Sequence, residues 1–472
     1  MRSVVVKTLL GIFLVLAIVW ALILGWWQSN DFSPSPGEML LYLLGVPLTL
    51  IVGYLLLQGF IEHLKKPVEV AAPSAPAARD DDPLARAGAA SDAAERNWSL
   101  SLLASHVSLA SGKSAADALA AVAEGRRPAP SSRLQDDAGF PAFVAEVADL
   151  DIDQLTEQLQ ATQPALVQVD ESPAFVRALG LLDSVIDAVR NDIDPLREAN
   201  PESFHLSVLC LLPETWQPAL MPLLRQYLGD RLANDLPGVA VEIMVLQAKH
   251  EVDALRQLDA AIVRCNRDPL DDEFLLVLGT VSAVDEDCIA QWAGQGSLFT
   301  AAHQDGSIPG EGAVALLLTR QATVDRLQRD NALTVSRLVH GSRDKRLDAG
   351  GRVGGKLIAG LFGSLLETTA TDPASLNAVL LDTDHRAAYM TEALEGLGES
   401  IAHLDPLKDV LAIGLVAGSL TPIGGLLALA AAGARSLAEN APVLCLSNHH
   451  PLERAMLIVR PAPASEPETS TS

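Results

Sequence analysis

Cysteine and histidine are among the side chains of this sequence that could serve as nucleophiles, general bases or metal ligands. The chain has four widely spaced cysteines, none in a Cys-x-x-Cys pair: Cys210, Cys265, Cys288 and Cys445. Neither a structural zinc site nor a disulfide framework is therefore expected. His449 and His450 stand together after an apolar run. A metal pair there would need carboxylates that the sequence does not place, so we interpret the dipeptide as a polar strand exit.

The common nucleotide-binding and hydrolase motifs are absent from the sequence. No Gly-x-Gly-x-x-Gly opens a helix after a strand, and neither Gly-x-x-x-x-Gly-Lys-Ser/Thr nor Gly-x-Ser-x-Gly occurs. The chain therefore offers no Rossmann fingerprint, P-loop or lipase-type nucleophile elbow. We assign no catalytic, cofactor-binding or metal-ligating residue and expect no cofactor.

Composition narrows the class of protein. The chain has 472 residues, of which 49% are hydrophobic and 4% aromatic, and its formal net charge is −25. The apolar content is high enough for a large core and excludes wholesale disorder. The negative charge excludes the basic footprint that sequence-independent nucleic-acid binding requires, so no nucleic-acid partner is expected.

Two uncharged apolar segments near the N-terminus, about residues 8–27 and 39–61, are each long enough to span a bilayer. Lys and Arg flank the pair on both sides, and the loop between the segments has none. The positive-inside rule then predicts a transmembrane hairpin, residues 1–66, with both ends in the cytoplasm. We expect an inner-membrane protein of a bacterium with a cytoplasmic soluble domain; a pair of buried core helices is the alternative.

The rest of the chain divides by composition into a linker, a domain and a tail. Residues 67–95 are rich in Ala, Pro and Asp without apolar periodicity, which is typical of a linker, and residues 462–472 form a polar tail that we expect to be disordered. In residues 96–461, strands alternate with helices, which predicts an α/β domain with parallel sheets covered on both faces.

The predicted elements follow from apolar runs, helical periodicity and turn residues. The predicted strands are 99–109, 143–150, 203–212, 239–246, 274–284, 313–318, 333–338, 378–382, 410–415, 443–447 and 455–459. The predicted helices are 115–124, 173–189, 216–228, 252–263, 353–366, 387–397 and 422–437.

Two segments resemble the thiolase-like superfamily, specifically the β-ketoacyl synthases. The first, residues 278–320, contains Pro309-Gly310-Glu311-Gly312-Ala313 before an apolar strand. The second, residues 378–460, includes GSLTPIGGLLALAAAG, which is similar to the turn before the Ala-rich helix of that family. The resemblance spans about residues 97–461 and implies two similar halves, about 96–325 and 326–461, packed as layers in the order αβαβα.

The same resemblance shows departures at the positions of the family's catalytic residues. After the strand 239–246, Lys249 and His250 stand where a condensing enzyme has its nucleophilic cysteine. Gly418-Ser419 replaces the family's Gly-His, and His385 is offset from the family's other histidine. When a reaction depends on several positioned groups, its transition state loses most of its stabilisation if those groups are missing. We therefore predict a retained fold and a lost catalytic site.

The overall layout of an apolar N-terminus, an acidic linker and an α/β domain also resembles the type VI secretion lipase adaptor family. That resemblance implies a non-enzymatic protein-binding factor whose partner is a secreted lipase effector or a secretion spike protein. An active or partner-dependent β-ketoacyl synthase-like acyltransferase of lipid or polyketide assembly is the alternative. A structural subunit that pairs with an active synthase, or a homodimer, also fits the resemblance.

Overall fold

The computed structural model describes Trp20, Trp26 and Met39 singly, and residues 94–199, 203–236, 238–270, 272–329, 331–349 and 354–462. The chain divides between Ala89 and Ala90 into two units, and the fold below is that of the second. The predicted membrane hairpin lies outside the described residues, except for those three residues. Most of the predicted linker and most of the predicted tail also lie outside them. Within the described part, no helix has the length and apolar character needed to cross a membrane.

The first half of the domain contributes five strands to a large sheet. They are β1 (Ser99–Leu109), β4 (His205–Pro213), β5 (Ala240–Ala248), β6 (Glu273–Ser282) and β7 (Glu311–Thr319). Their spatial order is β5-β4-β6-β7-β1. β4, β5 and β6 run parallel, and β7 runs antiparallel to both β6 and β1.

The second half repeats this pattern. Its strands are β8 (Leu333–Ser336), β10 (Ala378–Leu381), β11 (Val410–Ala412), β12 (Val443–Ser447) and β13 (Glu453–Pro461), in the order β11-β10-β12-β13-β8. β10, β11 and β12 run parallel, and β13 is antiparallel to β12 and β8. An extra strand, β9 (Val339–Ser342), pairs with β13, and β1 pairs with β8 to join the halves.

The predicted parallel pairing is confirmed only for β4, β5 and β6 and for β10, β11 and β12, and it is wrong for the sheet as a whole, which is mixed. β13 follows β12 after a connection of only five residues, 448–452, which is too short for the crossover that a parallel pair needs. In the first half, β7 is antiparallel between β6 and β1 and has buried residues throughout. Its continuous apolar run is indistinguishable in sequence from that of a buried parallel strand.

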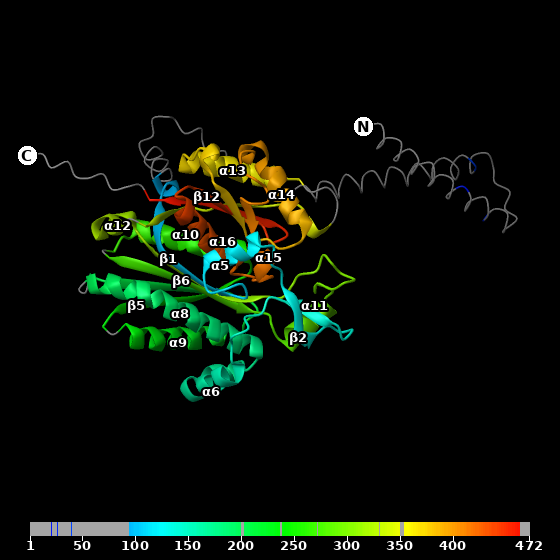
Figure 1. The fold of residues 1–472 in the computed structure, drawn as a ribbon, viewed down its shortest axis with the longest axis horizontal. Coiled ribbons are helices and arrows are strands. Elements are labelled where there is room, and N and C mark those ends of the chain that lie inside the picture. The colour runs from blue at the N-terminus through cyan, green and yellow to red at the C-terminus, as the bar shows by residue number, and fades with distance from the viewer. Residues whose placement is uncertain are drawn as a thin grey trace, which may run out of the picture. The chain divides into compact units, whose positions relative to one another are not determined.

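Helices form three layers around the two halves of the sheet (Figure 1). The central layer contains α5 (Ala115–Ala123), α10 (Glu251–Arg267) and α16 (Gly424–Glu439). The outer layer of the first half contains α8 (Pro173–Ala199) and α9 (Leu220–Asp235), with α6 (Ile152–Thr162) and α7 (Pro164–Val169) beyond them. The outer layer of the second half contains α13 (Lys356–Thr369) and α14 (Ala387–Leu397). Each of the three helical layers packs on the sheet through its own hydrophobic core, and the core of the central layer contains strands of both halves.

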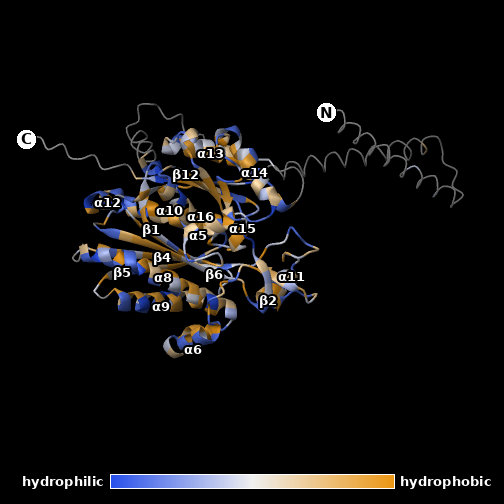
Figure 2. Ribbon diagram, viewed as in Figure 1, coloured by the Kyte–Doolittle hydropathy of each residue, from blue (hydrophilic) through white to orange (hydrophobic). Residues whose placement is uncertain are grey.

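The composition of α16 follows from its central position. Every residue from Gly424 to Gly433 is buried, because the helix contacts strands of both halves. Figure 2 shows the hydrophobic colouring concentrated in the strands and inner helices. The small Gly and Ala side chains allow close packing: a Cβ on Gly425 would lie 2.9 Å from Leu255 Cδ1 of α10. This stretch of α16 is apolar all round because the helix is buried on both sides.

Two excursions from the sheet complete the fold. β2 (Ala129–Gln135) and β3 (Pro141–Val144) form a separate hairpin whose small core includes residues of α11 (Glu286–Gly294). The predicted strand at 143–150 is thus wrong in extent. The predicted strand at 410–415 ends early because α15 (Gly414–Ala417) begins there. α12 (Gln321–Leu327) leads from β7 towards β8.

Candidate functional site

The loops that follow parallel strands of both halves meet at one edge of the sheet. Glu214 and Lys249 follow β4 and β5, and Asp285 comes three residues after β6. From the second half, Asp382 follows β10 directly, and His449 comes two residues after β12. Ligands of α/β proteins bind outside the carboxyl ends of parallel strands, so this edge is the candidate site.

A cavity of about 720 Å³ opens at this edge. Its apolar wall includes Phe175, Trp216 and Trp292. Its charged lining consists of four carboxylates and one cation: Asp170, Glu214, Asp285, Asp287 and Lys249. The single cation lies 3.9 Å from Glu214, and both side chains of this pair are more than half exposed. The cavity therefore carries an excess of negative charge.

The Pro-Gly-Glu-Gly-Ala motif positions the loop that brings Ser419 to the cavity. Pro309 and Ser419 form a parallel bridge, and the Ser419 backbone N–H donates to the Ile308 carbonyl at 2.8 Å. A Cβ on Gly310 would lie only 2.1 Å from the Ala417 carbonyl oxygen. Only glycine permits this close approach between the two backbones.

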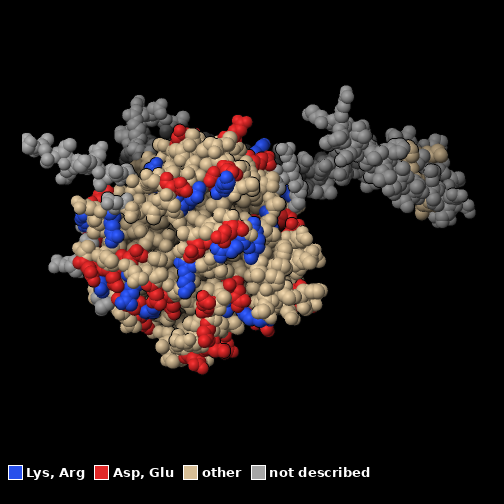
Figure 3. Space-filling model, in the orientation of Figure 1, with Lys and Arg blue, Asp and Glu red and all other residues tan. Residues whose placement is uncertain are grey.

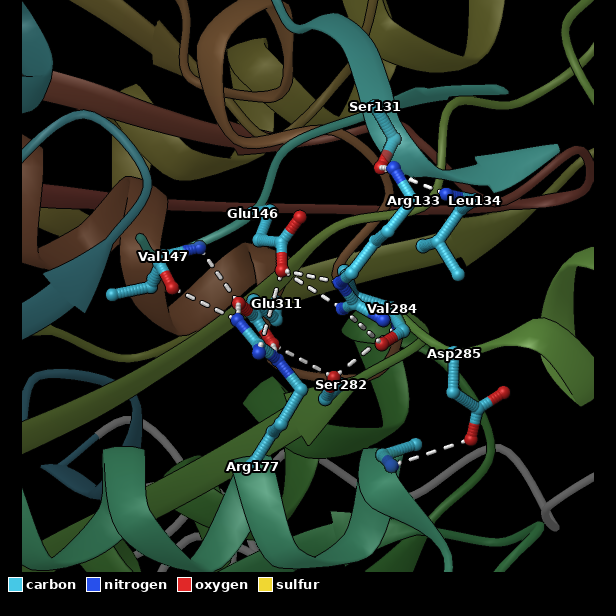
Figure 4. A network of polar contacts seen from close by, with 11 residues as sticks. Ser131, Arg133, Leu134, Glu146, Val147, Arg177, Ser282, Val284, Asp285 and Glu311 are labelled. Carbon is cyan, nitrogen blue, oxygen red and sulfur yellow. Dashed lines mark hydrogen bonds and ion pairs between the residues drawn. The ribbon is translucent and has the colours of Figure 1, made fainter. Parts of the chain in front are cut away.

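Glu311 of the same motif is the centre of a buried polar network (Figure 4). Its carboxylate accepts hydrogen bonds from Arg177 Nε at 2.7 Å, from the Val147 N–H at 2.6 Å and from Ser282 Oγ at 2.9 Å. Burial alone would lower the pKa of Arg177, but the hydrogen bond and the charge of Glu311 raise it above its ordinary value. The network ties α8 to the start of β7 and supports the cavity wall at Ser282.

The start of α10 is occupied by polar residues other than cysteine. His250 is the N-cap residue, and its side chain accepts a hydrogen bond from the Asp253 N–H. Glu251 is 1% exposed and accepts a hydrogen bond from Thr421 Oγ1 at 2.5 Å.

Asp382, the first residue after β10, is buried close to Glu251. Its Oδ1 accepts from the backbone N–H groups of Asn448 and His449 at 2.8 and 3.0 Å, and its Oδ2 accepts from Ser447 Oγ. A Cβ on Gly424 would touch both carboxylate side chains, at 3.3 Å from Glu251 Cγ and 3.5 Å from Asp382 Cβ. Burial, and then the negative charge of Glu251, raise the pKa of Asp382 to about 6.

A serine, a histidine and an aspartate lie in line beside this acid pair. Ser419 Oγ is 3.3 Å from His449 Nε2, and His449 Nδ1 is 3.8 Å from Asp384 Oδ2. Asp384 also accepts from Arg386 Nε at 2.8 and 3.0 Å, and Arg386 lies over the Tyr389 ring. Burial alone would raise the pKa of Asp384, but the charges of His449 and Arg386 hold it below its ordinary value.

The other histidines near strand ends point elsewhere. His385 Nε2 lies 3.1 Å from the Gln304 carbonyl, and its ring packs edge-on against Phe299. His450 stacks on His250 with ring centres 4.2 Å apart, and burial followed by the neighbouring His250 lowers the pKa of His450 to about 4. Among the described residues, no group of His, Cys, Asp and Glu is arranged to hold a metal ion.

The cysteines lie where apolar packing predicts, with one exception. Cys210, Cys265 and Cys445 are buried, and burial raises the pKa of each thiol above its ordinary value. Cys288 is half-buried in the first turn of α11 and lines the cavity. Burial, and then the charge of Asp285, raise the pKa of Cys288 to about 12, so the thiol stays protonated.

The interpretation of His449-His450 as a simple polar strand exit did not predict that His449 contacts Ser419. His449 follows β12, Ser419 follows β11 and α15, and the two meet because β10 lies between these strands in the sheet. The available signal was the recurrence of polar residues at successive strand exits, at Asp382, Asp384 and His449. The sequence could not show which of these exits face one another.

Comparisons with known proteins identify the fold. No family model matches the sequence, and no curated protein sequence matches it. Among solved structures, the ketosynthase from module 6 of the bacillaene synthase of Bacillus subtilis 168 superposes with a TM-score of 0.54 at 12% identity, covering 77% of this chain and 72% of that one. The module 1 ketosynthase of the bacillaene synthase of Bacillus amyloliquefaciens FZB42 gives 0.53 at 13% identity, over 80% and 75%.

A third structure is described as a type II PKS acyl-carrier protein in complex with its ketosynthase bound to the hexaketide. It gives a TM-score of 0.53 at 12% identity and covers 78% of this chain and 100% of that one. The domain therefore has the thiolase-like fold of the ketosynthases. At this level of identity the likeness concerns the fold alone.

Proposed function

We propose that this thiolase-like domain does not carry out cysteine-dependent condensation and acts by binding a protein partner. The observation that carries the proposal is the start of α10, where His250 caps the helix and Glu251 is buried against Thr421. A nucleophilic thiol needs a helix N-terminus or a neighbouring cation to form the thiolate. Here the site offers a carboxylate at that point, which disfavours a second negative charge.

The charge of the cavity also argues against acyl-carrier substrates. A phosphopantetheine arm carries a phosphodiester, and four carboxylates with one cation would repel it. Acidic side chains also gather on the face shown in Figure 3, over the part where Figure 1 places α6 and α9. The same charges favour a basic segment of a protein, whose apolar side chains could pack on Trp216 and Trp292.

The adaptor role and the membrane hairpin belong to this proposal. A secreted lipase effector, or a protein of the secretion spike, is the class of partner that we propose, with residues 8–27 and 39–61 anchoring the chain in the inner membrane. Such an adaptor needs a docking surface and no condensing chemistry. A reporter enzyme that is active only in the periplasm, fused after Ser472, should be silent; strong reporter activity would contradict the cytoplasmic assignment.

Charge reversal at the rim of the cavity tests the docking role. Glu214 and Asp287 are exposed, so changing both to lysine should leave the fold intact. We expect the affinity for a purified lipase effector, measured by calorimetry with the full-length protein, to fall at least tenfold. Glu367→Lys on α13 reverses an exposed carboxylate outside the cavity lining and away from α6 and α9, and serves as the control. Equal affinity of all three proteins, or no binding by the wild type, would contradict the proposal.

A further inference from the structure

Ser419, His449 and Asp384 have the relative positions of a nucleophile, a general base and the acid that orients the base. The Oγ–Nε2 distance is 3.3 Å and the Nδ1–Oδ2 distance is 3.8 Å, on opposite sides of the same imidazole ring. The first contact is within hydrogen-bond range, and the second is a longer ion-pair contact. Catalytic hydrogen bonds are often long or poorly aligned before substrate binds. The same constellation recurs on unrelated folds and is recognised by geometry rather than by sequence position.

The position of Ser419 gives this arrangement access to a substrate. Ser419 is half-buried and lines the 720 Å³ cavity, whereas His449 and Asp384 are 8% and 3% exposed behind it. Arg386 Nη2 lies 3.4 Å from both ring nitrogens of His449, and Arg386 Nε donates to the Asp384 carboxylate. The base is therefore confined by packing, and the hydroxyl faces open space.

We infer that Ser419 is the nucleophile of an acyl-transfer site for carboxylic esters, with His449 as its general base and Asp384 as the residue that positions His449. This activity goes beyond the protein-binding role and does not depend on it. It also departs from the expectation of a non-enzymatic domain, which rested on the missing cysteine.

The reaction needs only the ester and water. Ser419 Oγ attacks the ester carbonyl carbon while its proton passes to His449 Nε2. The bond between the carbonyl carbon and the alcohol oxygen then breaks, and the leaving alcohol takes the proton from His449. Water attacks the resulting acyl-serine, giving its proton to His449, and the carboxylic acid leaves as Ser419 regains its proton.

The cavity selects the class of ester. Phe175, Trp216 and Trp292 offer an apolar wall for an uncharged acyl chain, and the four carboxylates repel anionic groups. Esters with a neutral or cationic alcohol therefore fit, and acyl phosphates and acyl thioesters on phosphate-bearing carriers do not.

A fluorophosphonate probe tests the nucleophile directly in the purified full-length protein. We expect peptide mass spectrometry to locate the adduct on Ser419. His449→Ala should lower the labelling rate by about 10²-fold, since a positioned general base contributes about 10²–10⁴-fold. Asp384→Asn should lower the rate, and Asp384→Glu, which keeps the charge, should restore most of it.

The control is Ser342→Ala, which removes an exposed serine hydroxyl on β9 and should label at the wild-type rate. Hydrolysis of p-nitrophenyl butyrate should be lost in Ser419→Ala and retained in Ser342→Ala. Absence of an adduct on Ser419 in the wild-type protein, whose fold is verified by circular dichroism, would overturn the inference. So would an adduct only on other serines. Both results come from the wild-type protein alone, so they do not depend on whether a variant folds. They are also independent of the partner-binding experiment.

Discussion

Replacing Gly310 with alanine would place a methyl group against the backbone that presents Ser419. The new Cβ would lie 2.1 Å from the Ala417 carbonyl oxygen and 3.2 Å from Leu420 Cδ2. Carbon–oxygen contacts settle at about 3.3 Å, so the loop would have to retreat by about 1 Å. Overpacking of this kind costs about 1–3 kcal/mol, and a displacement of about 1 Å at a reacting group can cost about 10²-fold in rate.

Urea-induced unfolding of the full-length protein, followed by tryptophan fluorescence, measures the first effect. We expect Gly310→Ala to lower the free energy of unfolding by about 1–3 kcal/mol and the fluorophosphonate labelling rate to fall with it. Gly294→Ala is the matched control, because its added Cβ has no heavy atom within 4 Å apart from its chain neighbours and its own helix backbone. An unfolding curve for Gly310→Ala that coincides with the wild-type curve would refute the close approach of Gly310 to the Ser419 loop.

Three further predictions concern the buried charges and the thiols. Arg177→Met should lower the free energy of unfolding by about 3–5 kcal/mol, because it leaves Glu311 as a buried carboxylate without its cation; adding Glu311→Leu should recover part of this loss in the same urea titration, and no recovery would count against the pair. The pKa of Asp382 is raised from 3.8 to about 6, so the folded state binds the proton of this carboxyl group more tightly than the unfolded state does. The stability that protonated Asp382 contributes is therefore present below about pH 4 and is lost as the pH rises through about 6. Asp382→Asn should remove that loss, and identical pH dependences of unfolding for variant and wild type would contradict the assignment. Replacing all four cysteines with Ala or Ser should cost stability through core truncation but leave partner binding unchanged; loss of binding in a folded variant, traced to one cysteine, would restore the case for thiol chemistry.

The strands and inner helices were predictable because burial on both faces leaves a strong apolar signal. The predicted strand 99–109 and helix 387–397 coincide with β1 and α14. Glycines at close backbone contacts also leave a recognisable pattern in the sequence, as in the motif from Pro309 to Ala313. The helix predicted at 173–189 continues to Ala199 in the structure, because Ile193 and Leu196 remain on its buried face beyond the polar residues that suggested an end.

The candidate site was not predictable in the same way. Ser419 and His449 are 30 residues apart, on loops whose meeting depends on the position of β10 between β11 and β12. Glu251 and Thr421 come from opposite halves of the domain and meet only when α10 and α16 pack together. Strand order and helix packing decide these contacts, and neither leaves a local pattern that can be recognised in a single sequence.

The central claim is that this protein has no activated thiol at the start of α10, where the strand ends converge. Incubation of the full-length protein with octanoyl-N-acetylcysteamine, followed by peptide mass spectrometry, measures acyl transfer to every cysteine in one experiment. We expect all four cysteines to remain unmodified in the folded protein: Cys210, Cys265, Cys288 and Cys445. A stoichiometric octanoyl thioester on any one of them would contradict it.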